Sequence, residues 1–427
     1  MTLFVTVAAA LVFFALVMAS IALHEVGHLV PAKLFGVKVT QFSVGFGRSL
    51  WQRRRGETQY AIKALPLGGY VRLVGMYPPA RPGRGEGRLA RFADEARELE
   101  YEQITAADDG RLFHQKPVWQ RVVVMLGGPL MNLLLAVLIL GAVNALHGQY
   151  RPQLVTERVS ECVVPAGRQE QTCRGGDPSA PAQAAGVRPG DRLVSFNGVE
   201  LHSWAQFSGL IRDNGAGSAQ LVVERDGRRV ELPRVNTVVT GLPSRLDPGR
   251  TVEAGFLGIS PQYRQLRGGL GTTAQDLWLQ SRQSLTALAL FPVKVWNVAV
   301  DLVSGNSRDA NGPTSIIGAS RAAGEIAVTD QLDRGDRIAS WFSMLASVNL
   351  FVCLLNLVPL PPLDGGHIAG ALYEAIRRAT ARLLGRPDPG PVDTARLLPV
   401  AYGVGGFLLL AGVVLIIADL VSPVKLF

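Results

Sequence analysis

The sequence predicts a polytopic α-helical membrane protein with four transmembrane helices, a membrane-associated β-hairpin region and a separate β-rich domain. Three observations lead to this fold class. Apolar runs with few or no charges, each about the length that crosses a bilayer, occur four times in the 427 residues. A long polar segment separates the second run from the third. Basic residues follow the first run and the third, as they do beside membrane spans.

The expected elements follow one another in a simple order. The stretch that contains Pro292 and Lys294 is only moderately apolar, which predicts an amphipathic helix in the membrane interface and not a fifth span. The predicted regions are the first transmembrane helix with a polar motif (1–35), a cytoplasmic β-hairpin region with a flexible loop (36–120), the second transmembrane helix (121–147), an outside β-rich domain (150–265), the interfacial helix with a linker (275–335), the third transmembrane helix with an aspartate motif (341–366) and the fourth transmembrane helix (397–421).

Positive charge beside the spans predicts their orientation. Lys and Arg residues are dense after the first span, as at 53–55, and after the third, as at 377–386. Cytoplasmic loops carry such an excess, so the N-terminus and the long polar segment should lie outside. The net charge of +9 therefore reflects membrane topology and the lipid bilayer as a partner. Nucleic acid is excluded, because the basic residues form no known nucleic-acid motif with stacking aromatics.

The end of the first span carries His24, Glu25 and His28. Two histidines four residues apart lie on one helix face, where both imidazoles can bind one Zn²⁺. A glutamate between them can act on a water molecule as general base. Ionisable residues are costly inside a membrane and mark functional sites there, which argues against a chance pattern. The sequence thus predicts peptide-bond hydrolysis in or at a membrane, with one zinc ion per chain.

A catalytic zinc ion usually has three protein ligands, and Asp364 is the expected third. The first and third spans run in the same direction, so Asp364 reaches the depth of His24 and His28, near the cytoplasmic side. A turn aspartate in an Asp-Gly sequence is the ordinary alternative. His367 is a nearby rival ligand.

Residues 37–44 and 58–65 alternate as strands do, and glycines such as Gly68 and Gly69 punctuate the region. A substrate helix hides its scissile carbonyl within its own hydrogen bonds and has to be drawn out before it is cut. An exposed strand edge can pair with the freed backbone. The hairpin region is therefore a candidate substrate site, with an ordinary surface hairpin as the alternative.

The outside segment has the turn signals of a small β-rich domain, among them Asn197-Gly198. Cys162 and Cys173 lie near its start, and an oxidising compartment permits a disulfide between them. Free thiols remain the alternative, since no Cys-x-x-Cys spacing indicates a metal.

At this point the chain resembles the bacterial site-2 protease family of intramembrane zinc metalloproteases, which includes the regulator-of-sigma-E protease. The likeness covers most of the chain in matching order, and its motifs are specific together although the metal pentapeptide alone is not. The segments that carry it are His24 to His28, Pro66 to Val71, Phe113 to Arg121, Gly127 to Asn132, Gly186 to Gly198 and Asn356 to Gly366.

The resemblance implies roles for these residues. His24, His28 and Asp364 would bind zinc, and Glu25 would be the catalytic base. The residues expected to contact substrate are Gly68, Gly69, Tyr70 and Asn356. Substrates would be single-span proteins, such as anti-sigma factors or remnant signal peptides, in the bacterial cytoplasmic membrane.

The outside domain resembles a PDZ domain that binds a peptide or protein ligand. Its ligand loop would be Gly255, Phe256, Leu257, Gly258 and Ile259. Some family members carry two PDZ domains in tandem, whereas this segment has room and one clear signature for a single one. Substrate gating of the two-domain kind is therefore not carried over.

Two other functions fit parts of the sequence. A non-catalytic scaffold would bind protein termini and hold a structural metal, but closed structural sites usually have four protein ligands. A metal transporter would need polar residues through several spans. The second and fourth spans offer little beyond Asn132 and Asn144, so an open catalytic site is favoured.

Overall fold

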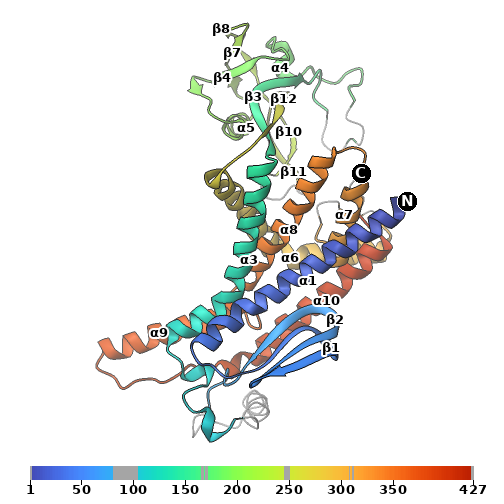
Figure 1. The fold of residues 1–427 in the computed structure, drawn as a ribbon. Coiled ribbons are helices and arrows are strands. Elements are labelled where there is room, and N and C mark those ends of the chain that lie inside the picture. The colour runs from blue at the N-terminus through green and yellow to red at the C-terminus, as the bar shows by residue number, and fades with distance from the viewer. Residues whose placement is uncertain are drawn as a thin grey trace. The chain divides into compact units, whose positions relative to one another are not determined.

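The computed structural model of the chain describes residues 2–79, 104–164, 168, 172–244, 251–306, 308–309 and 312–424. The chain divides into two compact units (Figure 1). The first unit joins both ends of the chain, Met1–Ala142 and Thr273–Phe427, and the second unit is Val143–Thr272. Most of the flexible loop expected before residue 120 falls at 80–103, outside the described residues.

Five helical segments of the described chain are long and apolar enough to cross a membrane. Four of them match the predicted spans, and the fifth, α6, contains the stretch predicted as interfacial. α6 is one continuous helix of 35 residues, although Pro292 lies inside it. The five are α1 (Thr2–Leu34), α3 (Val118–Leu146), α6 (Leu270–Ser304), α8 (Arg334–Asn356) and Thr394–Val421, which comprises η3 (Thr394–Leu397) and α10 (Leu398–Val421).

α6 touches α3 near its start and α10 from its middle towards its end. Near its start, Thr273 lies beside Gly141 of α3. At its middle, the ring of Phe291 meets Phe407 of α10 edge-on, with centroids 6.2 Å apart. Towards its end, α6 packs on the C-terminal half of α10, in a buried cluster of Val295, Val298, Ala411, Leu415 and Ala418.

α1 has a different neighbour at each end. Its first half packs on α7 (Ile316–Val328) and α8, where the buried ring of Phe13 meets Trp341 with centroids 5.2 Å apart. Its second half crosses α3, and there a Cβ on Gly127 would lie 1.9 Å from the carbonyl oxygen of Gly27. Only glycine permits so close an approach of two helix backbones, so this pair fixes the crossing point.

β1 (Val39–Arg55) and β2 (Thr58–Leu73) form one long antiparallel hairpin that folds back on itself. Phe42, for example, pairs with Val71 on one side and with Tyr60 on the other. Gly45 and Gly68 have φ angles of 88° and 95°, which glycine adopts without strain, and they permit the bends. The strands expected from the sequence are present, and the folded hairpin has two edges, at 69–73 and 51–55.

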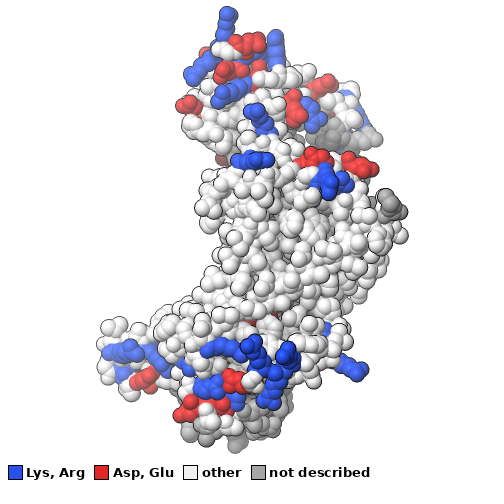
Figure 2. Space-filling view, in the orientation of Figure 1, with Lys and Arg blue, Asp and Glu red and all other residues white. Residues whose placement is uncertain are grey.

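α8 ends at Asn356, ten residues before the predicted end of the third span at Gly366. Three prolines follow, at 359, 361 and 362, and proline has no backbone N–H with which to continue a helix. The chain then turns into a helix that the sequence did not predict, α9 (Asp364–Leu383). Figure 2 shows basic side chains gathered at the end of the first unit that carries α9 and the hairpin, whereas the face over the long helices is almost uncharged.

A buried ion pair fastens α9 to α3. Arg121 donates from Nη2 to Glu374 Oε1 at 2.6 Å and from Nη1 to Oε2 at 3.1 Å. Glu374 is 1% exposed and Arg121 8% exposed. The backbone N–H of Val392 also donates to Glu374. Asp364 begins the same helix, so this ion pair anchors the element that carries Asp364.

The second unit is β-rich, as predicted. Its main sheet is antiparallel, and β12 forms an edge next to β3. Phe196 and Phe207 lie fully inside its core. Its elements are β3 (Gln149–Val159), α4 (Pro181–Ala184), β4 (Arg192–Phe196), β5 (Val199–Glu200), α5 (Trp204–Asp213), β6 (Ser218–Ala219), β7 (Leu221–Arg225), β8 (Arg228–Glu231), β9 (Val235–Asn236), β10 (Val238–Pro243), β11 (Thr251–Phe256) and β12 (Ile259–Leu266).

Candidate metal centre

Two histidines of α1 meet where α1 crosses α3. His24 and His28 lie one helical turn apart, both buried, and their Nε2 atoms are 3.2 Å apart. His28 Nδ1–H donates to the backbone carbonyl of Val124 in α3 at 2.8 Å. Because this bond keeps the His28 proton on Nδ1, the Nε2 that faces His24 carries a lone pair.

Asp364, the first residue of α9, completes the group. Its Oδ2 lies 3.4 Å from His24 Nε2 and 3.3 Å from His28 Nε2, and it is buried without a hydrogen-bond partner. Donor atoms that bind one tetrahedral zinc ion at about 2.0–2.1 Å lie about 3.3 Å from one another. The three measured distances therefore fit zinc. In the described part of the chain, this is the only such cluster of His, Cys, Asp and Glu side chains, and His367 is not part of it.

Glu25 lies beside the ligands without joining them. It is 8% exposed, and Gly69 of β2 packs against it: a Cβ on Gly69 would lie 2.9 Å from Glu25 Cγ. The backbone N–H of Val71 hydrogen-bonds to the Glu25 carboxylate. A side chain at position 69 would displace the glutamate, so this glycine is what lets the strand approach it.

A cavity of about 430 Å³ joins these groups. The three ligands and Glu25 lie on its wall, together with one edge of the hairpin and the end of α8. All residues predicted to contact substrate line this cavity, namely Gly68, Gly69, Tyr70 and Asn356. The sequence-predicted residues of the first unit are thus brought to one place, and His367 lines the same cavity without approaching the ligand atoms.

α3 forms the wall behind the ligands, a role that the sequence alone did not predict. A Cβ on Gly128 would lie 2.2 Å from His28 Nε2 and 2.6 Å from His24 Nε2, so only glycine leaves room for both rings. Val124 contributes the carbonyl that orients His28. The signal was present in the sequence as Gly127-Gly128 inside an apolar helix, where glycine is otherwise unfavourable.

The predicted ligand loop, 255–259, lies in the second unit. β11 ends at Phe256 and β12 begins at Ile259, so the loop is the tight turn between them. Gly258 has φ of 90°, and a Cβ there would lie 2.8 Å from the side chain of Ala180. None of these residues belongs to the metal group.

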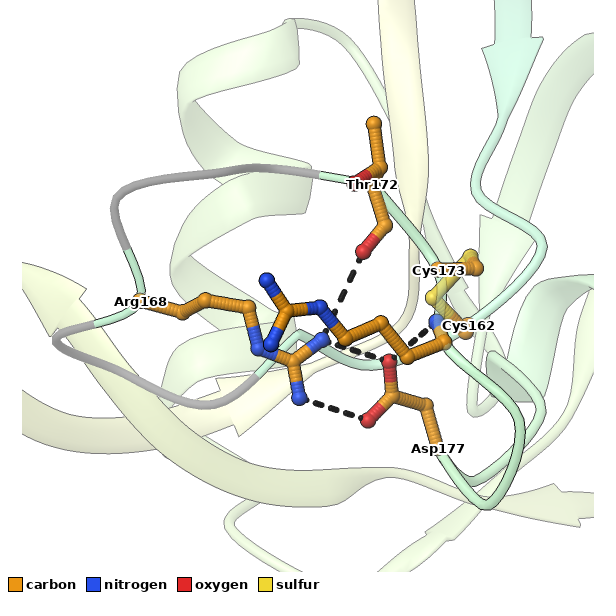
Figure 3. Close-up of a disulfide and its surroundings, with 6 residues drawn as sticks. Cys162, Arg168, Thr172, Cys173 and Asp177 are labelled. Carbon is orange, nitrogen blue, oxygen red and sulfur yellow. Dashed lines mark hydrogen bonds and ion pairs between the residues drawn. A yellow bond between two sulfur atoms is a disulfide. The ribbon is translucent and has the colours of Figure 1, made fainter.

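Cys162 and Cys173 form a disulfide in the second unit (Figure 3). The alternative of two free thiols is therefore wrong. Beside the disulfide, Arg168 donates to both carboxylate oxygens of Asp177, at 2.7 and 2.9 Å, and the Arg174 N–H donates to Asp177 at 2.8 Å. These hydrogen bonds, the one from Arg168 foremost, lower the pKa of Asp177 to about 2.

Comparison with known proteins agrees with this geometry. The profile of peptidase family M50 matches residues 12–384, a span that contains the three ligands and Glu25. The chain is 33% identical to the zinc metalloprotease Rip1 of Mycobacterium tuberculosis over 98% of both chains. It is 30% identical to the metalloprotease MmpA of Caulobacter vibrioides over 85% of both, and 27% identical to the zinc metalloprotease RasP of Shouchella clausii over 86% of this chain and 90% of RasP. The chain therefore belongs to peptidase family M50 and is an intramembrane zinc metalloprotease of the site-2 type.

Proposed function

We propose that this protease cuts single-span membrane proteins within or beside their transmembrane segments, with Glu25 as the catalytic base. The observation that carries the proposal is the place of Glu25, in one cavity with three zinc ligands and beside a strand edge. When bound, zinc polarises the scissile carbonyl and lowers the pKa of water. Glu25 coordinates nothing, so its carboxylate is available to take the proton of the attacking water and deliver it to the leaving amine.

The hairpin edge at 69–73 is the proposed substrate platform. In the described chain these residues pair with only one neighbour, the first part of β1, which leaves their other side open. The backbone of Val71 already donates from that side to Glu25. A substrate drawn out of its helix needs partners for its freed backbone groups, and an added strand at this edge obtains them next to the catalytic base. Asn356, at the end of α8, borders the same cavity and would help to position that strand.

Four membrane crossings fit the helix contacts better than five. Gly141 lies near the end of α3 opposite the metal, and the start of α6 touches it. The last part of α6 packs on Leu415 and Ala418, near the end of α10, whereas α10 begins near Tyr77, close to the hairpin. Both ends of α6 thus lie at the end of the unit away from the metal. α6 would then remain at that face without crossing the bilayer, as proposed for an interfacial helix.

The proposed location is the bacterial cytoplasmic membrane, with the metal near the cytoplasmic side. Two features support it. β1 carries basic residues at 53–55, and α9 and the segment after it carry them at 377–386. Figure 2 shows basic side chains gathered at the end of the first unit that carries α9 and the hairpin, as expected for the cytoplasmic side. The disulfide between Cys162 and Cys173 favours an oxidising compartment for the second unit.

The second unit is proposed to be a single PDZ-like domain that binds a peptide or protein outside the membrane. Its support is an exposed edge strand, β12, that follows directly after the tight turn at Leu257-Gly258. Such an edge can accept a ligand by strand addition. Its ligands would be the outer portions of substrates, of which anti-sigma factors and remnant signal peptides are the expected classes.

The decisive test of the base is Glu25→Gln in the full-length enzyme. Cleavage of a single-span reporter in liposomes should fall about 100- to 10,000-fold, because proton transfer is lost. Zinc content should remain at one per chain, because the three ligands are unchanged. Glu57→Gln, at the hairpin turn where Glu57 binds Arg111, is the matched control and should cleave normally. Normal cleavage by Glu25→Gln would remove Glu25 from the mechanism.

The platform is tested by proline at its open edge. Val71→Pro removes the N–H that points at Glu25 and should impair cleavage strongly with zinc retained. Arg53→Pro places the same residue on the opposite edge of the hairpin, where no effect on cleavage is expected. Equal cleavage by the two variants would mean that the edge at 69–73 does not hold substrate.

A further inference from the structure

Two asparagines lie deep among the helices beside the metal centre with no role in the reaction. Asn132 of α3 is 2% exposed and Asn349 of α8 is 1% exposed. The side-chain oxygen of each is buried without a hydrogen-bond partner, and so is Nδ1 of His24. Buried polar atoms in native proteins nearly always have a partner, so these two acceptors and one donor call for an explanation.

Helix register places Asn132 one turn away from His24. α3 runs antiparallel to α1: Gly127 meets Gly27, Val124 accepts from the His28 ring, and a Gly128 Cβ would touch the rings of both His28 and His24. One further turn along α3 brings Asn132 to about the level of the α1 turn that contains Ser20.

Asn349 reaches the same level from the other side. Its Nδ2 donates to Ser20 Oγ at 3.2 Å and to the Leu345 carbonyl at 2.9 Å, which leaves its Oδ1 unused. Helical side chains lean towards the N-terminus of their helix, so the His24 ring extends over the turn that contains Ser20. The His24 ring is therefore directed towards the level at which both amide oxygens lie.

We infer that Asn132 and Asn349 position His24 by holding one buried water between them. A zinc-bound histidine donates its second ring N–H to an acceptor; His28 uses the Val124 carbonyl, whereas His24 has no protein acceptor in the described chain. A water molecule that accepts from His24 Nδ1–H and donates one proton to each asparagine oxygen satisfies all three atoms. Three hydrogen bonds are the usual number for a buried water. The inference goes beyond the proposed reaction and rests only on zinc binding by His24.

Zinc affinity measured by chelator competition on the full-length protein tests this inference. Asn132→Leu and Asn349→Leu should each weaken zinc binding about 10- to 100-fold. The double variant should lose less than the product of the single losses, because both residues hold the same water. Asn132→Ser keeps an acceptor oxygen and should lose less than Asn132→Leu. The visible spectrum of bound Co²⁺ should change in the leucine variants, which a purely structural role would not cause.

Asn144→Leu is the matched control, since Asn144 is also a buried asparagine of α3 but lies three turns beyond Asn132. It should alter stability without altering zinc affinity. Wild-type zinc affinity in folded Asn132→Leu and Asn349→Leu would overturn the inference, even if Glu25→Gln proves inactive. If a variant does not fold, an experimental structure of the zinc-loaded wild type decides. An ordered water that is hydrogen-bonded to His24 Nδ1 and to both amide oxygens is expected. A direct hydrogen bond from His24 Nδ1 to one of these oxygens, or no ordered water between them, would contradict the inference.

Discussion

The two units differ in what they do with buried polar groups. In the second unit, Asp191 is 1% exposed and fully engaged: Arg225 donates to its two oxygens at 2.8 and 2.7 Å, and the Arg188 N–H donates at 2.8 Å. In the first unit, His24 Nδ1 and Asp364 Oδ2 are buried with no such partner. The buried carboxylate of the second unit is thus fully hydrogen-bonded, whereas Asp364 Oδ2 of the first unit has no hydrogen-bond partner and can bind a metal ion.

The first unit also contains buried charges that are paired. Its Arg121 and Glu374 are buried and bound to each other by two hydrogen bonds. Asp364 Oδ2 therefore differs from the Glu374 carboxylate of the same helix, which is fully hydrogen-bonded. A buried polar group that lacks a hydrogen-bond partner is most often found at a functional site.

The largest effect is expected from filling the space beside the zinc ligands of the first unit. Gly128→Ala should remove zinc and reduce cleavage to background, because its methyl group would lie 2.2 Å from His28 Nε2. Gly141→Ala on the same helix is the control, since its methyl group would meet Thr273 at an ordinary 3.9 Å. Metal analysis of both purified variants measures the difference. A zinc-loaded, active Gly128→Ala enzyme would show that the histidine rings are less confined than the structure shows.

A second change breaks the buried ion pair between Arg121 and Glu374 in the first unit. Arg121→Met removes two hydrogen bonds from the buried Glu374 and leaves it only Arg378 and the Val392 N–H, which should lower the free energy of unfolding by about 3 kcal/mol. The double variant Arg121→Met, Glu374→Leu should recover much of this loss, because no charge remains without a partner. Denaturant unfolding in detergent measures both. If the double variant is no more stable than the single one, the ion pair is not the cause.

Removal of the disulfide should destabilise the second unit and leave the metal centre of the first unit unchanged. Serine at both Cys162 and Cys173 should cost about 2–3 kcal/mol, because a loop with a sequence separation of 11 is no longer closed in the unfolded chain. Hydrogen exchange should report the loss in the second unit, while zinc content and the exchange of α1 stay unchanged. Loss of zinc in this variant would mean that the two units do not fold independently.

The smallest expected effect is a pH dependence confined to the second unit. Burial raises the pKa of Asp191, but hydrogen bonds from Arg225 and from the Arg188 N–H outweigh it, so the net pKa is lowered. The stability from this carboxylate is then complete above its ordinary pKa of about 4 and is lost as the pH falls towards the lower folded value. Asp191→Asn should flatten this dependence in hydrogen exchange of β4 and β7 between pH 6 and 3. An equal dependence in the variant would assign it to other groups.

The sequence predicted the two histidines from a local pattern and Asp364 from the common direction of the first and third spans. His24 and His28 stand four apart at the end of an apolar run, and Asp364 follows a run of the same direction. The strands were predicted from the alternation of apolar and polar residues. The pairing of β1 residues on both sides was not predicted, because it depends on bends at Gly45 and Gly68 that the alternation does not reveal. The boundary at Asn356 was missed because apolar residues continue past it, while the prolines that end the helix came later in the run.

Other features were out of reach because they arise only from packing. α9 has no long apolar run; its inner face is built around Glu374, whose partner Arg121 is more than 250 residues away in the sequence. The role of Gly128 depends on α3 lying against α1, which no local pattern states. The continuous course of α6 through Pro292 likewise rests on its contacts with α10.

The position of the ligands along the chain has a consequence for biosynthesis. Two ligands are made within the first thirty residues, but the third begins α9, after both the second unit and α8. A ribosome therefore completes the second unit before it supplies Asp364. The nascent enzyme carries an incomplete metal centre while its own chain is being inserted, and becomes able to hydrolyse peptide bonds only once nearly all of its helices are in place.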